Sequence, residues 1–256
     1  MKNIIHLKRP VYIVSSATVA GEEEYAGPLG KSYDYHSSDD DTFGCETWEK
    51  SESEMQKRAL ETALSKAGFC NDDIDCVFAG DLVNQCSASN YGLLSFHIPF
   101  LGIYGACSTA AEGLLLSSLL CSSGYVRRAA AVTSSHNASA ERQFRFPLEY
   151  GAQRCPTCQW TVTGSGAFII SDEQKDTANP YISEIVIGKA TDAGICDANN
   201  MGAAMAPVSV KLRPYPIPKL RRYASVFHHT KQVFRRSKIA CVLGITLIFK
   251  EYLICR

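Results

Sequence analysis

Residues 108–123 constrain the fold more than any other segment, because a helix there is apolar or small on nearly every face. Glu112 is its only charged residue, and short apolar stretches precede and follow it. A helix without a polar face lies inside a larger domain rather than on its surface. The chain has 256 residues, 46% of them hydrophobic, and is long enough to bury such a helix.

Strand and helix patterns alternate over most of the chain. Apolar residues at spacings of three and four predict a helix from Trp48 to a stop at Gly68, and a shorter helix runs through Tyr91. Between the helices lie short apolar stretches, which predict strands at 11–21, 74–79, 127–135, 161–171 and 181–191. This alternation indicates an α/β fold with a mixed, mostly parallel sheet, in which the buried helix follows Cys107.

The charges divide the chain near Val208. Of its 26 basic and 26 acidic residues, 11 bases but only one acid lie in residues 209–256. One interpretation of this basic tail is an arm for nucleic acid or anionic lipid. The interpretation we favour is an aberrant, frameshifted C-terminus, irregular and unrelated to residues 1–208, and we expect no nucleic-acid partner. The apolar stretch 239–249 is too short to cross a bilayer, and fits a strand, an interfacial segment or read-through.

The cysteine pattern favours a reducing compartment. Eleven cysteines are scattered without a disulfide framework, and no signal peptide precedes them, so we expect an intracellular protein. The pair Cys155 and Cys158 is weak support for zinc without two further ligands, and we expect no metal and no cofactor. The glycines of TGSGA, residues 163–167, lack the spacing of a phosphate-binding loop and suit a strand bend instead.

Cys107 follows a Gly105-Ala106 turn and opens the buried helix. At that place the positive end of the helix dipole favours a thiolate, and therefore nucleophilic or anion-binding chemistry. The alternative is a buried, inert thiol, because free cysteine is among the most buried residue types.

A polar cluster follows the strand at 127–135 in the sequence SSHNASAERQFRF. Ligands of open α/β sheets collect at the carboxyl ends of strands, so this cluster is placed to face Cys107. His136 could act as a base and Asn137 could donate to an oxyanion, while Arg142 and Arg145 could hold a carboxylate. In the alternative, the segment is a solvated loop whose arginines pair with Glu141 and Glu149.

Several motifs together resemble one family. GACSTA, TSSHNASAERQFRFPLEYG, TVTGSGA and NNMGAAMAP closely resemble the stage V sporulation protein AD family of endospore-forming bacteria, from about Lys8 to Pro207. The resemblance implies a thiolase-like fold made of two similar halves. This chain would hold the N-terminal half only, because the likeness stops near Val208, which suggests a truncation or frameshift.

The resemblance also implies a function. The family is linked to movement of dipicolinic acid into the forespore, binds dipicolinate, and associates with other proteins of its operon at the spore inner membrane. In related condensing enzymes the partners of the nucleophilic cysteine come from the second half, so the resemblance disfavours catalysis here. Dipicolinate is a dicarboxylate, which suits Arg142 or Arg145, His136 with Asn137, and the helix start at Cys107.

Two other functions stay open. The chain could be an acyltransferase of the thiolase or ketoacyl synthase type that uses Cys107 as its nucleophile. It could also be a scaffold for membrane proteins of the same operon, with a pocket left from an ancestral enzyme. A homodimer is compatible with each of the three functions.

Overall fold

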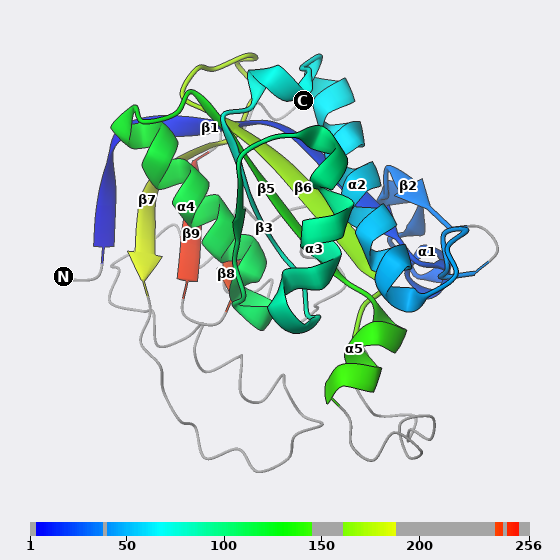
Figure 1. Cartoon of the computed structure of the whole chain (residues 1–256). Helices are drawn as coiled ribbons and strands as arrows, with labels where there is room; N and C mark the ends of the chain where they lie inside the picture. Colours follow the sequence, from blue (N-terminus) through cyan, green and yellow to red (C-terminus); the bar gives the residue numbers. More distant parts are fainter. Residues whose placement is uncertain (1–3, 38–39, 145–160, 188–238, 243–244, 251–256) are drawn as a thin grey trace, which may run out of the picture.

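The computed structural model describes residues 4–37, 40–144, 161–187, 239–242 and 245–250, which form one nine-stranded sheet with helices on both faces (Figure 1). The strand order is β4-β3-β5-β6-β1-β7-β9-β8, and β2 pairs with β1. The strands are β1 (Ile4–Ala20), β2 (Tyr35–His36), β3 (Cys76–Gly80), β4 (Phe100–Gly102), β5 (Arg128–Ser135), β6 (Gly164–Ser171), β7 (Tyr181–Ile187), β8 (Ile239–Val242) and β9 (Ile245–Lys250).

Five α-helices and five short 3-10 helices connect the described strands. The α-helices are α1 (Glu22–Ala26), α2 (Trp48–Ala67), α3 (Ser87–Gly92), α4 (Thr109–Ser123) and α5 (Asn137–Phe144). The 3-10 helices are η1 (Gly30–Ser32), η2 (Asn71–Asp73), η3 (Asn84–Cys86), η4 (Leu94–Phe96) and η5 (Ala106–Ser108).

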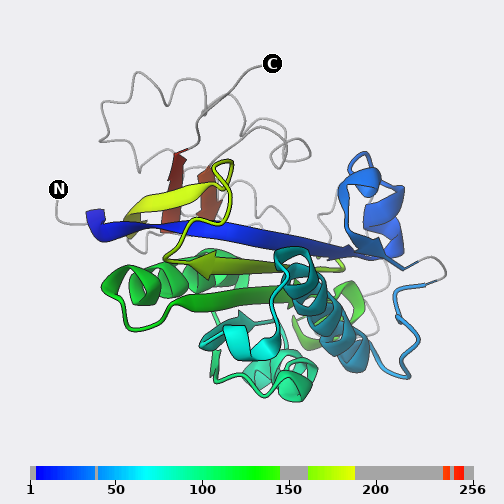
Figure 2. The ribbon, with the colours of Figure 1, turned by 90° about the horizontal axis from the view of Figure 1, so that it is seen from above.

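The sheet is mixed, as the sequence predicts. β3 pairs in parallel with both β4 and β5, whereas β6 is antiparallel to β5 and to β1. The pairings make β1 to β5 and β9 run one way and β6, β7 and β8 the other. Figure 2 shows how β1 runs along the molecule between β6 and β7.

Residues along each central strand alternate between two hydrophobic clusters. In β3, Val77 and Ala79 pack in the cluster that contains Leu60 of α2, whereas Cys76 and Phe78 pack in the cluster that contains Leu114 of α4. Because successive side chains of a strand point to opposite faces, α2 and α4 cover opposite faces of the sheet. The predicted α/β fold is therefore confirmed, with three layers in which the sheet lies between the two long helices.

The two long helices begin and end where the sequence predicts. The Thr47 hydroxyl accepts from the backbone of Lys50 at the start of α2, and Gly68 ends that helix with a φ of 64°. Gly124 ends α4 with a φ of 81°. Buried residues lie on several sides of α4, as expected for a helix without a polar face.

The structure corrects the prediction of a polar loop after β5, because residues 137–144 form α5. Ala138, Ala140, Glu141, Arg142 and Gln143 are favourable in a helix, and these local preferences outweigh the polar composition. Arg145, Glu149 and the Cys155–Cys158 pair lie outside the described residues.

Part of the C-terminal tail belongs to the sheet. The apolar stretch 239–249 contributes β8 and β9, and β9 pairs with β7. Of the three possibilities for this stretch, the structure therefore shows strands. The predicted boundary at Val208 lies outside the described residues. Among the helices that the structure describes, none combines the length and apolar character that a membrane span requires.

Candidate ligand-binding site

The turn that carries Cys107 is a tight elbow before α4. Cys107 lies in η5 and is exposed, so the alternative of a buried thiol is wrong. The preceding Ala106 has a φ of 46°, a left-handed conformation that costs a non-glycine residue roughly 1–2 kcal/mol. The Thr109 hydroxyl donates to the Ala106 carbonyl at 2.8 Å and accepts from the Gly105 amide at 3.1 Å. These bonds hold the thiol at the surface in a strained turn, as is common at functional sites.

The carboxyl end of β3 packs directly against the elbow. Gly80 ends that strand, and a Cβ atom there would overlap the Ile103 carbonyl oxygen and lie 2.6 Å from Cγ2 of Thr109. Tyr104 reaches the next residues of the chain, because its hydroxyl donates to the Leu82 carbonyl at 3.3 Å. Only glycine allows this close approach, which places the elbow at the carboxyl edge of the sheet.

A network of hydrogen-bonded, buried polar side chains lies at the same edge of the sheet. It was not predicted from the sequence. The Gln56 amide donates to the hydroxyls of Ser89 at 2.9 Å and Ser134 at 2.8 Å, and to the Gly80 carbonyl at 3.3 Å. The Ser134 hydroxyl in turn donates to Glu52 at 2.9 Å. This hydrogen-bond network therefore joins α2 to the ends of β3 and β5 and to α3.

A buried carboxylate lies at each end of this network. Ser139 of α5 also donates to Glu52, at 2.8 Å, while Asp81 accepts from the Ser89 hydroxyl at 2.5 Å and from the backbone amides of Ser89 and Val83 at 2.8 Å. Glu52 is 0% exposed and Asp81 is 1% exposed. Within the described residues, hydroxyl and amide groups alone hydrogen-bond these two carboxylates.

Burial has raised the proton affinity of both acids. Desolvation raises the pKa of Glu52 to about 7, against the lowering effect of the Ser139 and Ser134 hydroxyls, and the nearby Asp81 adds to the rise. Desolvation also raises the pKa of Asp81, although three hydrogen bonds favour its ionised form. Two acids with raised pKa values at the carboxyl edge of a sheet mark a candidate functional site.

His136 has a structural place between β5 and α5. Its Nδ1 atom accepts from the Ala138 amide at 3.2 Å and caps α5, and its Nε2 atom donates to the Asp41 carbonyl at 2.9 Å. The ring is 1% exposed and lies 5.2 Å from the ring of Trp48. Desolvation lowers the pKa of His136, so the neutral ring is favoured. The nitrogen that could act as a base, Nδ1, is already occupied by the Ala138 amide, so a base role would require it to give up that hydrogen bond.

Two further predicted site residues lie on α5. The Asn137 side chain donates to the Thr161 carbonyl at 2.9 Å and ties the start of α5 to the segment before β6. Arg142 forms an ion pair with Glu49 of α2, and about half of its side chain is exposed. Arg142 therefore pairs with α2, whereas the solvated-loop alternative paired the arginines of this segment with Glu141 and Glu149. Thus Arg142 and Cys107 are the predicted residues that the structure leaves open to solvent.

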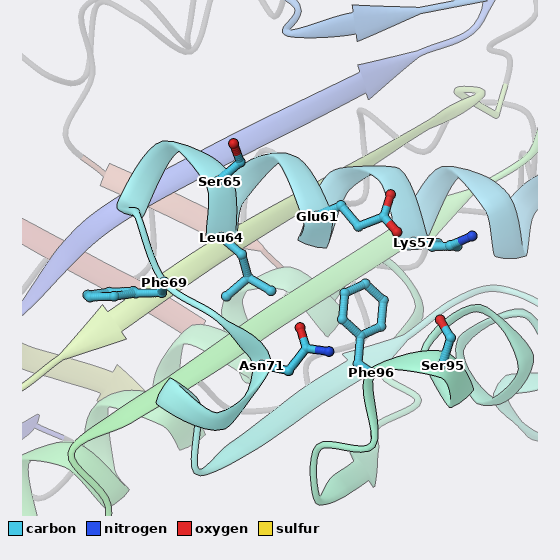
Figure 3. A pocket seen from close by; sticks show the side chains of 8 residues that line it. All are labelled: Lys57, Glu61, Leu64, Ser65, Phe69, Asn71, Ser95 and Phe96. Atoms are coloured by element: carbon cyan, nitrogen blue, oxygen red, sulfur yellow. The ribbon is translucent and has the colours of Figure 1, made fainter.

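A groove of about 490 Å³ opens elsewhere, between the second half of α2 and η4 (Figure 3). Its lining residues are Lys57, Glu61, Leu64, Ser65, Phe69, Asn71, Ser95 and Phe96. None of the predicted site residues lines this groove. In the described part of the chain, no group of three or more histidine, cysteine or acidic residues is placed to hold a metal ion.

Compared with known proteins, the chain matches the profile of the family described as Stage V sporulation protein AD over residues 1–215. It is 44% identical over 202 residues to Stage V sporulation protein AD of Bacillus subtilis (strain 168). The match covers 79% of this chain and 59% of that relative. The chain therefore spans less than two thirds of the length of the curated relative.

Solved structures with a similar fold include an OleA and a 3-oxoacyl-(acyl carrier protein) synthase III. A histidine variant of OleA from Xanthomonas campestris has a TM-score of 0.56 at 14% identity, over 81% of this chain and 72% of that one. The 3-oxoacyl-(acyl carrier protein) synthase III, FabH, from Xanthomonas oryzae has a TM-score of 0.54 at 13% identity, over 79% and 71%. At such low identity the likeness shows the fold alone, and it confirms the predicted thiolase-like fold.

Proposed function

Because the chain belongs to the stage V sporulation protein AD family, we propose that it is a non-catalytic, thiolase-like protein that binds dipicolinate during sporulation. In this proposal it serves the uptake of dipicolinic acid into the forespore. The ligand site lies at the carboxyl edge of the sheet, between the Cys107 elbow and α5.

The observation that carries the non-catalytic role is the position of His136. Both ring nitrogens are held inside the chain, and the neutral ring caps α5 instead of facing a thiol. A buried, doubly hydrogen-bonded histidine is suited to shaping a site rather than to moving protons. His136 and Asn137 therefore contribute to the proposed site by fixing the start of α5.

Arg142 is the residue that we assign to a ligand carboxylate. Its pair with Glu49 is partly exposed, and pairs of that kind stabilise a fold by at most about 1 kcal/mol. A planar dicarboxylate can therefore take over the guanidinium without a large cost. Arg145 stays in the proposal as a second cation, although it lies outside the described residues.

Equilibrium binding of dipicolinate to the chain tests this proposal. We expect saturable binding that Arg142→Ala weakens at least about tenfold, since a charge-assisted contact is lost. Arg127→Ala is the matched control, because Arg127 also forms an exposed pair, with Glu173, but at the opposite end of β5. Equal affinity in both variants would refute the assignment, and an absence of saturable binding would refute the function.

An acyltransferase is the second candidate, and the exposed thiol of Cys107 favours it. In this alternative the thiolate attacks an acyl thioester, a thiol leaves, and an acyl-cysteine forms. Intact mass spectrometry after incubation with acyl thioesters decides, with Cys107→Ala as the control for other thiols such as exposed Cys70. A stable adduct that Cys107→Ala removes would establish the acyltransferase, and no adduct would dismiss it.

We propose that the chain works at the spore inner membrane with other proteins of the same operon, from inside the cell. The alternative of a scaffold without a ligand makes a distinct prediction for the same partners. If pull-down of operon proteins is unchanged by dipicolinate and by Arg142→Ala, the scaffold is favoured. Capture that depends on dipicolinate would support the ligand-binding role.

A homodimer is proposed through β4. This strand is at one edge of the sheet, and Leu101 within it is 46% exposed. Tyr104, which follows, is 49% exposed, and an open apolar edge strand favours pairing with a second copy. Sedimentation velocity of the chain and of Leu101→Lys tests this, with a dimer expected only for the unmodified chain.

A further inference from the structure

Trp48 is an exposed aromatic residue at the junction of α2 and α5. It is the first residue of α2, where the Thr47 hydroxyl accepts from the Lys50 amide at 3.3 Å and fixes the start of the helix. Trp48 remains 36% exposed, and in the described part of the chain its indole N–H makes no hydrogen bond. An indole of this kind offers a broad apolar face and one free donor to a ligand.

A fixed neighbour supports the ring of Trp48. The His136 ring packs against it, with 5.2 Å between the ring centroids and 39° between the ring planes. His136 is itself held at both nitrogens, by the Asp41 carbonyl and by the Ala138 amide. The indole is therefore oriented before any ligand arrives, and a preorganised aromatic surface loses little conformational entropy on binding.

Arg142 reaches the same end of α2. Its guanidinium pairs with the carboxylate of Glu49, the residue next to Trp48. Partial burial raises the pKa of Glu49, but hydrogen bonds from Arg142, from its own amide and from the Thr47 hydroxyl outweigh burial and lower the pKa overall. Glu49 thus occupies the position that a bound carboxylate would take, beside an aromatic ring.

The spacing of these contacts suits an aromatic dicarboxylate. Trp48 packs on His136, the residue before α5, whereas Arg142 lies in the last turn of that helix. The two contacts are therefore about 8 Å apart along the axis of α5. One carboxylate can lie on the long Arg142 side chain while the ring that bears it lies on Trp48.

We propose that Trp48 makes the site specific for aromatic dicarboxylates, by stacking on the ligand ring while Arg142 exchanges Glu49 for one ligand carboxylate. The proposal rests on the proposed function, which assigns that carboxylate to Arg142. The indole face supplies the stacking contact, and the indole N–H can donate to the second carboxylate. A saturated dicarboxylate of the same charge offers Arg142 the same carboxylate but gives Trp48 no ring to stack on.

Calorimetric affinities for three dicarboxylates test the proposal: dipicolinate, isophthalate, and the fully hydrogenated cis analogue of isophthalate. The last two carry the same two charges at the same ring positions, and only one of them is aromatic. We expect the unmodified chain to prefer isophthalate to its saturated analogue by at least about threefold. Trp48→Leu should weaken both aromatic ligands about threefold to tenfold and leave the saturated one unchanged, whereas Trp48→Phe should keep most of the affinity.

Tyr125→Leu is the matched control, because Tyr125 is another exposed aromatic residue but lies just after α4, at the opposite end of β5 from α5. If Trp48→Leu binds dipicolinate as tightly as the unmodified chain, or weakens aromatic and saturated ligands by the same factor, the proposal is overturned. The ligand preference of the unmodified chain needs no variant to fold, and equal affinities for isophthalate and its saturated analogue would also overturn the proposal.

Glu49→Gln tests the exchange at Arg142. The variant removes the charge that competes with the ligand, so it should bind aromatic and saturated dicarboxylates alike about twofold to fivefold more tightly. Glu54→Gln is its control, because Glu54 pairs with Arg58 on the same helix. Weaker binding by Glu49→Gln would overturn the exchange.

The same titrations separate this proposal from the proposed function. If Arg142→Ala weakens dipicolinate binding but Trp48→Leu does not, the proposed function stands and the role of Trp48 is overturned. If none of the three dicarboxylates gives saturable binding, both proposals are overturned.

Discussion

Glu52→Gln should change how the stability of the chain depends on pH. The substitution keeps the shape of the side chain but removes the titrating group from a site that is 0% exposed. The pKa of Glu52 is about 7 in the fold against an ordinary value of 4.5. At about 1.4 kcal/mol for each pH unit, ionising Glu52 costs the folded state on the order of 3 kcal/mol.

The sign follows from the proton balance. Between the two pKa values the folded chain binds a proton that the unfolded chain has released, so the free energy of unfolding falls as the pH rises. The contribution of Glu52 is fully present below about pH 4.5 and is lost by about pH 7 to 8. Glu52→Gln does not have this loss, and should become more stable than the unmodified chain as the pH rises, by up to about 3 kcal/mol.

Urea unfolding followed by circular dichroism measures this difference at several values between about pH 5 and about pH 8. Glu61→Gln serves as the control, because this glutamate lies exposed on the same helix. Other titrating groups, including His136 and Asp81, are common to all three chains, and their direct contributions cancel in the difference. A difference between Glu52→Gln and the unmodified chain that stays constant with pH would refute the reasoning.

Three other substitutions test the geometry of the site by thermal or urea unfolding. Gly80→Ala should destabilise the chain by about 1–3 kcal/mol, because the new Cβ overlaps the Ile103 carbonyl, and a neutral result would contradict the close approach. Ala106→Gly should stabilise it by up to about 1 kcal/mol by relieving the left-handed turn, whereas a destabilised variant would argue against strain there. His136→Ala should cost about 2–4 kcal/mol through the lost Ala138 cap and the cavity, and an unchanged midpoint would show that the ring is not structural.

The long helices could be predicted from the sequence because their signals are local. The period of apolar residues in α2, the glycine at each end point and the apolar character of α4 depend on near neighbours only. α5 was missed because its polar composition suggested a solvated loop, although its helix-favouring residues were visible. A cap from His136 completes that helix, and histidine is not among the usual capping residues.

The candidate site was only partly predictable. The sequence placed Cys107 on an elbow and gathered His136, Asn137 and Arg142 after a strand, and the structure agrees with both placements. It could not show that His136 turns to the carbonyl of Asp41, which is 95 residues away in the chain. Contacts of that range are set by the packed fold and leave no mark in local spacing.

The buried carboxylate network had a signal that could have been used. Glu52 and Gln56 fall on the same helical face as Met55 and Ala59, which the apolar period assigns to the core. Polar residues on a core face need partners or a function. The serines that satisfy them lie on β5, α3 and α5, so the partners could not be named from the sequence.

Calorimetric titration of the chain with dipicolinate at about pH 8 tests the central claim most directly. We predict saturable binding that Arg142→Ala weakens at least about tenfold and that Arg127→Ala leaves unchanged. Heats that do not saturate, or one affinity shared by both variants, would contradict a dipicolinate site beside α5.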